Sequence, residues 1–130
     1  MEIVPVAETL TLGCKNDIAI VGFGINDAAQ KRDEKLFRES TAGVLKLLNE
    51  FAGKSIIITP IPATAEAEEN RERYSDIIRE ECKLYPQVTL LEGSDFFPED
   101  ASLLCDGLHP NDQGMEVYAN GLIKAIKPLL

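Results

Sequence analysis

Short apolar runs alternate along the chain with longer segments in which apolar residues recur every three or four positions. The short runs are rich in β-branched residues and predict strands covered on both faces, as in parallel sheets, over residues 17–24, 55–61 and 87–92. The longer segments predict helices over residues 33–52, over residues 66–84, and from residue 111 or 112 to near the last residue.

Each predicted helix has one apolar face. The positions expected to be buried are Phe37, Thr41, Val44, Leu48 and Phe51 in the first helix, Tyr74, Ile77, Ile78 and Cys82 in the second, and Met115, Tyr118, Leu122 and Ile126 in the third. Charged positions of the second helix predict a solvated outer surface, formed by Glu68, Glu69, Arg71, Glu72 and Arg73. Gly53 stands just after the first helix, where a left-handed C-terminal cap is expected.

The order strand, helix, strand, helix, strand, loop, helix predicts an α/β fold. We expect a three-layer α/β/α sandwich with a short parallel sheet of three or four strands and right-handed crossovers. The 130 residues suit a single domain over 1–130. Ligands of such sheets bind beyond the C-terminal ends of the strands, so the loops after the first and third strands are the expected place for a site.

Composition narrows the possible partners. The 13 basic and 22 acidic residues give a net charge of -9, which disfavours nucleic acid and anionic membrane surfaces as partners. No apolar run approaches the roughly 20 residues that span a bilayer, and no signal-peptide pattern opens the chain. The cysteines Cys14, Cys82 and Cys105 form no C-x-x-C motif, so we expect a reduced, cytoplasmic protein in which each is a small buried apolar residue.

The loop after the first predicted strand reads Gly-Phe-Gly-Ile-Asn-Asp over residues 22–27. It begins like the G-x-G-x-x-G motif of dinucleotide-binding folds, but Asp27 replaces the third glycine. A carboxylate at that position repels a pyrophosphate where the helix N-terminus should attract it. A tight exit from the strand is the structural explanation for the two glycines.

The segment Cys105–Gly114 holds the only histidine, His109, three residues after Asp106. One interpretation is a turn cap followed by an exposed histidine before a helix. A metal site is a second, although one histidine with scattered carboxylates does not make a zinc set, and we expect neither a metal nor a cofactor. The third is a catalytic base, in which Asp106 fixes the imidazole tautomer and the other ring nitrogen takes a proton from a hydroxyl.

Together, the Gly-Ile-Asn-Asp of residues 24–27 and the Asp-Gly-Leu-His-Pro of residues 106–110 resemble the G-x-N-D and D-x-x-H-P blocks of the SGNH hydrolases, also called GDSL esterases. The Asn-Asp-x-Gly continuation at residues 111–114 looks like this family too, and the resemblance covers roughly residues 17–130. It implies a flavodoxin-like sheet and hydrolysis of an ester, such as an acyl or O-acetyl group. By the resemblance, His109 and Asp106 are the base and acid of a catalytic triad, and Asn26, in the loop that begins at Gly24, donates to an oxyanion hole.

The chain departs from the family in its N-terminal part. The nucleophile of the family lies in a Gly-Asp-Ser block after the first strand, and no Gly-Asp-Ser occurs in this sequence. Only about sixteen residues precede the strand that matches the family's third, so the resemblance implies a truncated sheet without the nucleophile segment. Ser94, Ser102 and Cys14 are candidates for a replacement nucleophile. Neither serine stands in a strand-to-helix elbow, and Cys14 lies upstream of the sheet in no recognisable motif.

Two functions follow as hypotheses. The first is an SGNH/GDSL-type hydrolase with a small-molecule ester substrate, inactive if the truncated chain lacks its nucleophile. The alternative is a non-catalytic, hydrolase-like interaction or assembly module. A missing first strand would leave the edge Ile18–Phe23 unpaired, which invites association. We therefore expect Met1–Leu12 to cover this edge, or another chain to cover it in a homo-oligomer.

Overall fold

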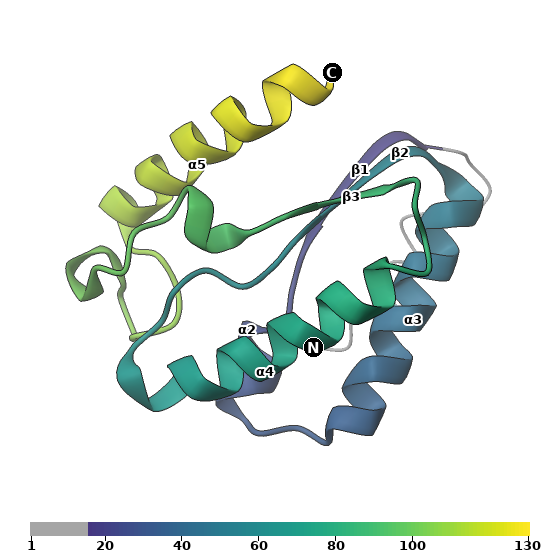
Figure 1. Cartoon of the computed structure of the whole chain (residues 1–130). Coiled ribbons are helices and arrows are strands. Elements are labelled where there is room, and N and C mark those ends of the chain that lie inside the picture. Colours follow the sequence, from purple (N-terminus) through teal and green to yellow (C-terminus); the bar gives the residue numbers. More distant parts are fainter. Residues whose placement is uncertain (1–15) are drawn as a thin grey trace.

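The computed structural model describes residues 16–130 of the chain (Figure 1). The elements alternate between strands and helices, as predicted. They are β1 (Asn16–Gly22), α2 (Ile25–Ala29), α3 (Glu34–Phe51), β2 (Ala52–Ile58), α4 (Ala65–Cys82), β3 (Val88–Leu91), the 3-10 turns η1 (Gly93–Asp95) and η2 (Ala101–Leu103), α5 (Asp112–Ile126) and the 3-10 turn η3 (Lys127–Leu129).

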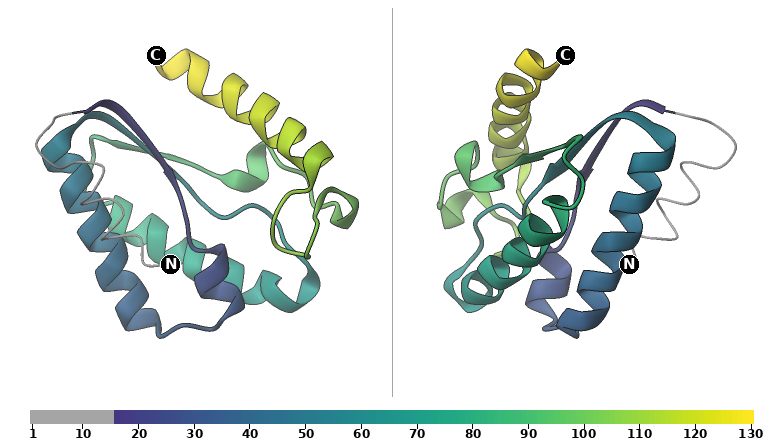
Figure 2. Two further views of the ribbon diagram at one scale, coloured as in Figure 1. Left: turned by 180° about the vertical axis from the view of Figure 1, so that it is seen from behind. Right: turned by 45° about the vertical axis from the view of Figure 1, so that its right-hand side comes forward.

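The described residues form one parallel sheet in the order β1-β2-β3. Helices α3 and α4 cover one face of this sheet, and α5 lies over the other (Figure 2). The α/β fold with helices on both faces of a parallel sheet is therefore confirmed. All three strands point their C-terminal ends to the same edge of the sheet, where the loops after β1, β2 and β3 meet.

Side-chain alternation along β2 builds two apolar layers. Ile57 is fully buried against α3 and α4, together with Phe37, Val44 and Ile78. The neighbouring Ile56 and Ile58 point to the opposite face, where Ile126 of α5 packs on them. A central strand covered on both faces is continuously apolar, which is why its sequence pattern predicted it well.

Two local predictions about the backbone are wrong. Gly53 is not a helix cap: α3 ends at Phe51, and β2 begins at Ala52 with no intervening loop, so Gly53 lies inside the strand. The segment after β1 was expected to be a loop, but residues 25–29 form the short helix α2, with Gly24 before it at φ 110°. The left-handed conformation that Gly24 adopts is accessible to glycine at no steric cost.

Three side chains predicted to be buried or solvated lie in the opposite environment. Met115 is 53% exposed, because α5 turns its Ile126 and Leu122 toward the sheet and leaves Met115 outside. Cys105 is exposed in the loop before α5, whereas Cys82 is buried as expected. Arg71 was expected in the solvated face of α4 and is only 4% exposed, because its guanidinium turns inward to the carbonyl oxygen of Pro60.

The edge strand β1 carries half-exposed apolar side chains. Ile20 pairs in register with the fully buried Ile56, on the α5 side of the sheet, yet Ile20 is 47% exposed and Ile18 is 43% exposed. The cause is that α5 packs on β2 and β3 and not on β1. The predicted cover of this edge by residues 1–12 lies outside the described residues. In the described part of the chain, no helix is long and apolar enough to span a membrane.

Candidate active site

Asp106 and His109 lie in contact in the turn before α5. The Nδ1 atom of His109 is 2.6 Å from Oδ2 of Asp106. An ionised carboxylate only accepts hydrogen bonds, so Nδ1 carries a proton, and in the neutral imidazole the acceptor nitrogen is then Nε2. This is the tautomer that a general base needs. The structure thus brings the two residues together as the base-and-orienter interpretation predicted.

Backbone hydrogen bonds hold the carboxylate in place. Oδ1 of Asp106 accepts the N–H groups of Leu108 at 2.9 Å and of His109 at 2.7 Å. Gly107, which lies between Asp106 and Leu108, has φ 82°, a left-handed conformation that favours glycine. A Cβ at Gly107 would also lie 2.8 Å from the side chain of Thr64. Glycine is therefore required here twice, by its conformation and by the close approach of the neighbouring loop.

The same contacts set the charge state of Asp106. The hydrogen bond from His109 and those from the backbone N–H groups lower the pKa of Asp106 from 3.8 to about 2. Because the pKa of Asp106 is lower in the folded than in the unfolded protein, these hydrogen bonds stabilise the fold at pH values above the unfolded pKa. Their contribution is lost as the pH falls through about 2. Asp106 is therefore a carboxylate throughout the neutral range, and it stays available to orient His109.

Substituting His109 should shift the titration of Asp106 measurably. In the wild-type protein, the ¹³C signal of the Asp106 carboxyl should titrate with a midpoint of about 2. In His109→Ala the midpoint should rise part of the way toward 3.8, because the backbone N–H groups of residues 108 and 109 still donate to the carboxylate. Equal midpoints in the two proteins would show that the imidazole of His109 does not hydrogen-bond to this carboxylate in solution.

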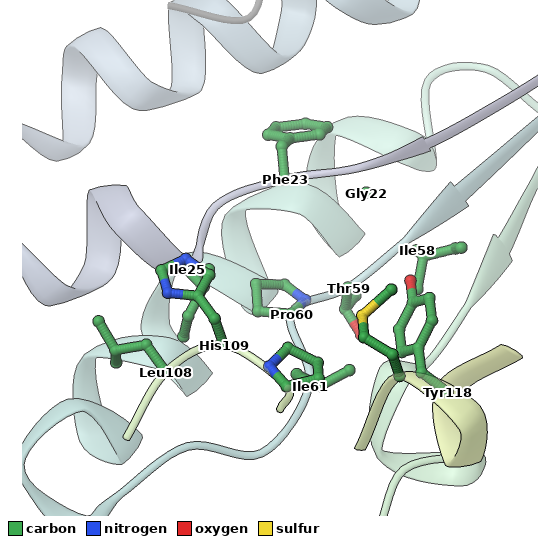
Figure 3. Close-up of a pocket in the computed structure, with 12 residues that line it drawn as sticks. Gly22, Phe23, Ile25, Ile58, Thr59, Pro60, Ile61, Leu108, His109 and Tyr118 are labelled. Atoms are coloured by element: carbon green, nitrogen blue, oxygen red, sulfur yellow. The ribbon is translucent and has the colours of Figure 1, made fainter. Parts of the chain in front are cut away.

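The dyad borders a pocket of about 210 Å³ at the C-terminal edge of the sheet. His109 projects from the segment before α5 toward the loop that follows β1 (Figure 3). The pocket is mostly apolar, and segments from four parts of the chain line it: Gly22, Phe23, Ile25, Ile58, Thr59, Pro60, Ile61, Leu108, His109, Pro110, Met115 and Tyr118. Small-molecule sites are typically apolar clefts with a few polar groups, so His109 is well placed to meet a bound ligand.

Thr59 lines the pocket but its hydroxyl is engaged elsewhere. Oγ1 of Thr59 donates to Glu92 at 2.7 Å and accepts the N–H of Gly93 at 3.0 Å. The carboxylate of Glu92 also accepts Nε and Nη2 of Arg79, at 2.7 and 2.9 Å. The hydrogen bonds from Arg79 chiefly lower the pKa of Glu92, so the network stays charged. Thr59 thus ties the ends of β2 and β3 together and is not free to act as a nucleophile.

Asn26 and Gly24 lie near the pocket without lining it. Asn26 is exposed in the first turn of α2, directly after Ile25, which does line the pocket. Gly24 is buried, and a Cβ added to it would lie 3.2 Å from the ring of Phe37 and 3.3 Å from the ring of Pro60. The oxyanion role of Asn26 therefore stays a prediction.

The described residues place no serine or cysteine side chain against the imidazole. Ser102 is exposed in η2, and its hydroxyl donates to Asp100 at 2.7 Å. Ser94 is exposed in η1, and neither serine lines the pocket. Cys105 is joined to His109 only by its backbone N–H, which donates to the His109 carbonyl at 2.9 Å. Cys14 lies outside the described residues.

Several residues were not predicted to belong to the site. Tyr118 was expected only in the core; its ring packs near those of Phe96 and Phe97, and it also lines the pocket. Thr64 occupies the N-cap position of α4, and its N–H donates to the carbonyl of Gly107 at 2.9 Å. The contact between Thr64 and Gly107 joins segments some forty residues apart, and a local sequence pattern cannot predict such a contact. Among residues 16–130, no three His, Cys, Asp or Glu side chains are grouped as a metal site would require.

Comparisons with known proteins gave one family match and a set of similar solved structures. The family model of GDSL-like lipases and acylhydrolases matches residues 5–117. No curated protein sequence matches the chain. Similar solved structures include the salicylyl-acyltransferase SsfX3 from a tetracycline biosynthetic pathway (15% identity, TM-score 0.77), the α/β hydrolase LAE5 from the metagenome of Lake Arreo, Spain (19%, 0.74), and a member of the lipolytic protein G-D-S-L family from Veillonella parvula (13%, 0.77).

These structural matches cover 97%, 98% and 95% of this chain, which spans 41%, 67% and 72% of the three solved chains in turn. At such low identity they show a shared fold. The fold they share is the α/β arrangement predicted from the sequence, with helices on both faces of a parallel sheet.

Proposed function

Because this chain belongs to the GDSL-like lipase/acylhydrolase family, we propose that it acts on ester bonds, with an acyl or O-acetyl ester as substrate. The observation that carries the proposal is the 2.6 Å contact between Asp106 and His109 at the mouth of an apolar pocket. The pocket suits the acyl part of an ester, and the polar dyad at its edge suits the reacting carbonyl.

In the proposed reaction, His109 is the general base and then the general acid. Its Nε2 takes the proton of a nucleophilic hydroxyl as that oxygen bonds to the ester carbonyl carbon. The side-chain amide of Asn26 donates to the resulting oxyanion. The C–O bond to the leaving alcohol then breaks, and the alkoxide receives the proton from Nε2. A water activated in the same way releases the acid, while Asp106 stabilises the imidazolium throughout.

The nucleophile in this proposal lies outside residues 16–130. Within the described pocket the hydroxyl-bearing residues are Thr59, whose hydroxyl is engaged with Glu92, and Tyr118. Burial raises the pKa of Tyr118 above its usual value, which makes the phenolate less accessible. A group from residues 1–15, or from an associated polypeptide, would have to approach Nε2 of His109 from the open side of the pocket.

Hydrolysis of p-nitrophenyl acetate by the full-length protein tests the proposal. We expect a rate above that of buffer and of an equal concentration of free imidazole, since free imidazole controls for the chemistry of the ring alone. A rate no higher than that of free imidazole would contradict the proposal and favour the second candidate.

The second candidate is a non-catalytic interaction module that associates through the edge of β1. The observation that favours it is the pair of half-exposed side chains Ile18 and Ile20 on the outermost strand of the described sheet. Unpaired apolar edges promote strand addition by another chain. We propose that this edge joins copies of the protein into a homo-oligomer.

Ile20→Lys should weaken this association. A charge on the edge opposes pairing, whereas the side chain is exposed enough that the fold should tolerate it. We expect sedimentation velocity to show a shift toward the monomer relative to the wild-type protein. Leu36→Lys, at a comparably exposed apolar site on α3, is the matched control and should leave the distribution unchanged. A monomeric wild-type protein would refute the oligomer.

A further inference from the structure

Glu68 and Arg71 form a partly buried ion pair in the first turns of α4, away from the dyad. Nε of Arg71 donates to Oε2 of Glu68 at 2.8 Å, and Nη2 donates to the other carboxylate oxygen. Burying a guanidinium is costly unless its donors find partners, so a side chain that is 4% exposed at this position needs a structural reason. The other hydrogen bonds of the pair supply that reason.

The pair fixes the loop between β2 and α4 at two points. Nη1 of Arg71 donates to the carbonyl of Pro60 at 3.0 Å, and Oε2 of Glu68 accepts the N–H of Ala63 at 3.0 Å. Burial of Glu68 raises its pKa, but the hydrogen bonds from Arg71 and Ala63 outweigh burial, and the pKa ends below its ordinary value. The carboxylate is therefore charged at neutral pH, and charge-assisted bonds are about twice as strong as neutral ones.

The loop held in this way supports the turn of the dyad. Thr64 directly follows Ala63, and its N–H donates to the carbonyl of Gly107 at 2.9 Å. The side chain of Thr64 also lies closest to the place where Gly107 would carry a Cβ. Gly107 directly follows Asp106, so any displacement of Thr64 shifts the turn in which the carboxylate meets His109.

We propose that Glu68 and Arg71 are positioning residues for the Asp106–His109 dyad, acting through Thr64 and Gly107. Neither side chain touches the imidazole or the reacting atoms. The expected loss of catalytic rate rests on the proposed function, whereas the expected loosening of the loop around Thr64 can be measured without it. Misplacing a catalytic group by about 1 Å can cost on the order of 10²-fold in rate.

Arg71→Met tests the proposal, because methionine keeps an unbranched side chain but removes every donor. We expect the amide of Thr64 to exchange its hydrogen at least about tenfold faster in the variant, while the amide of Ile57, in the central strand, changes much less. The kcat for p-nitrophenyl acetate should fall about tenfold with little change in KM. Arg73→Met is the matched control on the same helix: Arg73 is exposed, pairs with Glu34 at the surface, and should leave both readouts unchanged.

Glu68→Gln, which keeps the shape of the side chain and removes its charge, is the milder second variant and decides the matter if Arg71→Met does not fold. Equal acceleration of Thr64 and Ile57 in these variants would indicate a general loss of stability and overturn the proposal, as would no acceleration at all. If the wild-type protein proves inactive, the proposed function fails while the exchange measurement still decides the positioning role.

Discussion

Replacing His109 by alanine is expected to lower kcat/KM for ester hydrolysis by the full-length protein by about 10²–10⁴-fold, the usual contribution of a general base. The reason is geometric: Nδ1 of His109 is bound to Asp106 at 2.6 Å, which leaves Nε2 as the acceptor that borders the pocket. Alanine removes that acceptor and should leave the fold intact, because His109 lies on the surface. Initial rates with p-nitrophenyl acetate measure the effect.

Two further variants make this result specific. Asp106→Asn should lose a comparable factor, because an amide can donate to Nδ1 and so favour the wrong imidazole tautomer. Asp112→Asn removes an exposed carboxylate in the first turn of α5, outside the pocket, and should leave the rate unchanged. If His109→Ala retained the wild-type rate, the dyad would have no catalytic role.

Gly114→Ala should destabilise the fold by about 2–3 kcal/mol, although alanine normally stabilises a helix relative to glycine by about 1 kcal/mol. A Cβ at Gly114 would lie 2.1 Å from the carbonyl oxygen of Leu103, which is a backbone atom and cannot rotate away. The same carbonyl accepts the N–H of Asn111 at 2.8 Å, so the clash would reach the residues that follow His109. Urea unfolding at neutral pH measures the change in the free energy of unfolding.

The control for this prediction lies on the exposed side of the same helix. Ala119→Gly should cost about 1 kcal/mol or less, through helix propensity alone. A Gly114→Ala protein as stable as the wild type would show that α5 does not pack this closely on η2, and the position of the dyad would then need revision.

Local patterns predicted the strands and helices because burial on both faces of the sheet leaves a clear record in the sequence. The continuous apolar run around Ile57 and the helical spacing of Phe37, Thr41 and Val44 each correspond to buried side chains. The junction at Gly53 was mispredicted because α3 passes directly into β2. A glycine after a helix is a common cap, and only the pairing with β1 shows that it continues as strand.

The dyad was predictable because both partners lie within one turn. An aspartate three residues before a histidine can meet it through local geometry alone, and the structure confirms the contact. The pocket was not predictable, because Ile25, Thr59 and Tyr118 reach it from three separate elements. The predicted role of Asn26 depends on a bound oxyanion and is still a prediction.

Arg71 shows why charge patterns on a helix can mislead. Its neighbours Glu72 and Arg73 are exposed, as expected of an outer helix face. Arg71 is buried because the loop that contains Pro60 and Ala63 folds over the first turns of α4. The pattern of charges along the helix does not show that this loop covers it. Met115 was expected to be buried and is exposed, because α5 packs on β2 and β3 and no described element covers its other side.

We propose that His109 is a base whose nucleophile lies outside residues 16–130. The test is a fluorophosphonate ester, which bonds covalently to activated hydroxyls, followed by mass-spectrometric mapping of the adduct on the full-length protein. We expect a single adduct outside residues 16–130 of the His109-bearing chain, formed by the wild type and lost in His109→Ala. An adduct on Ser94 or Ser102, labelling that survives in His109→Ala, or no labelling of the wild type would contradict it.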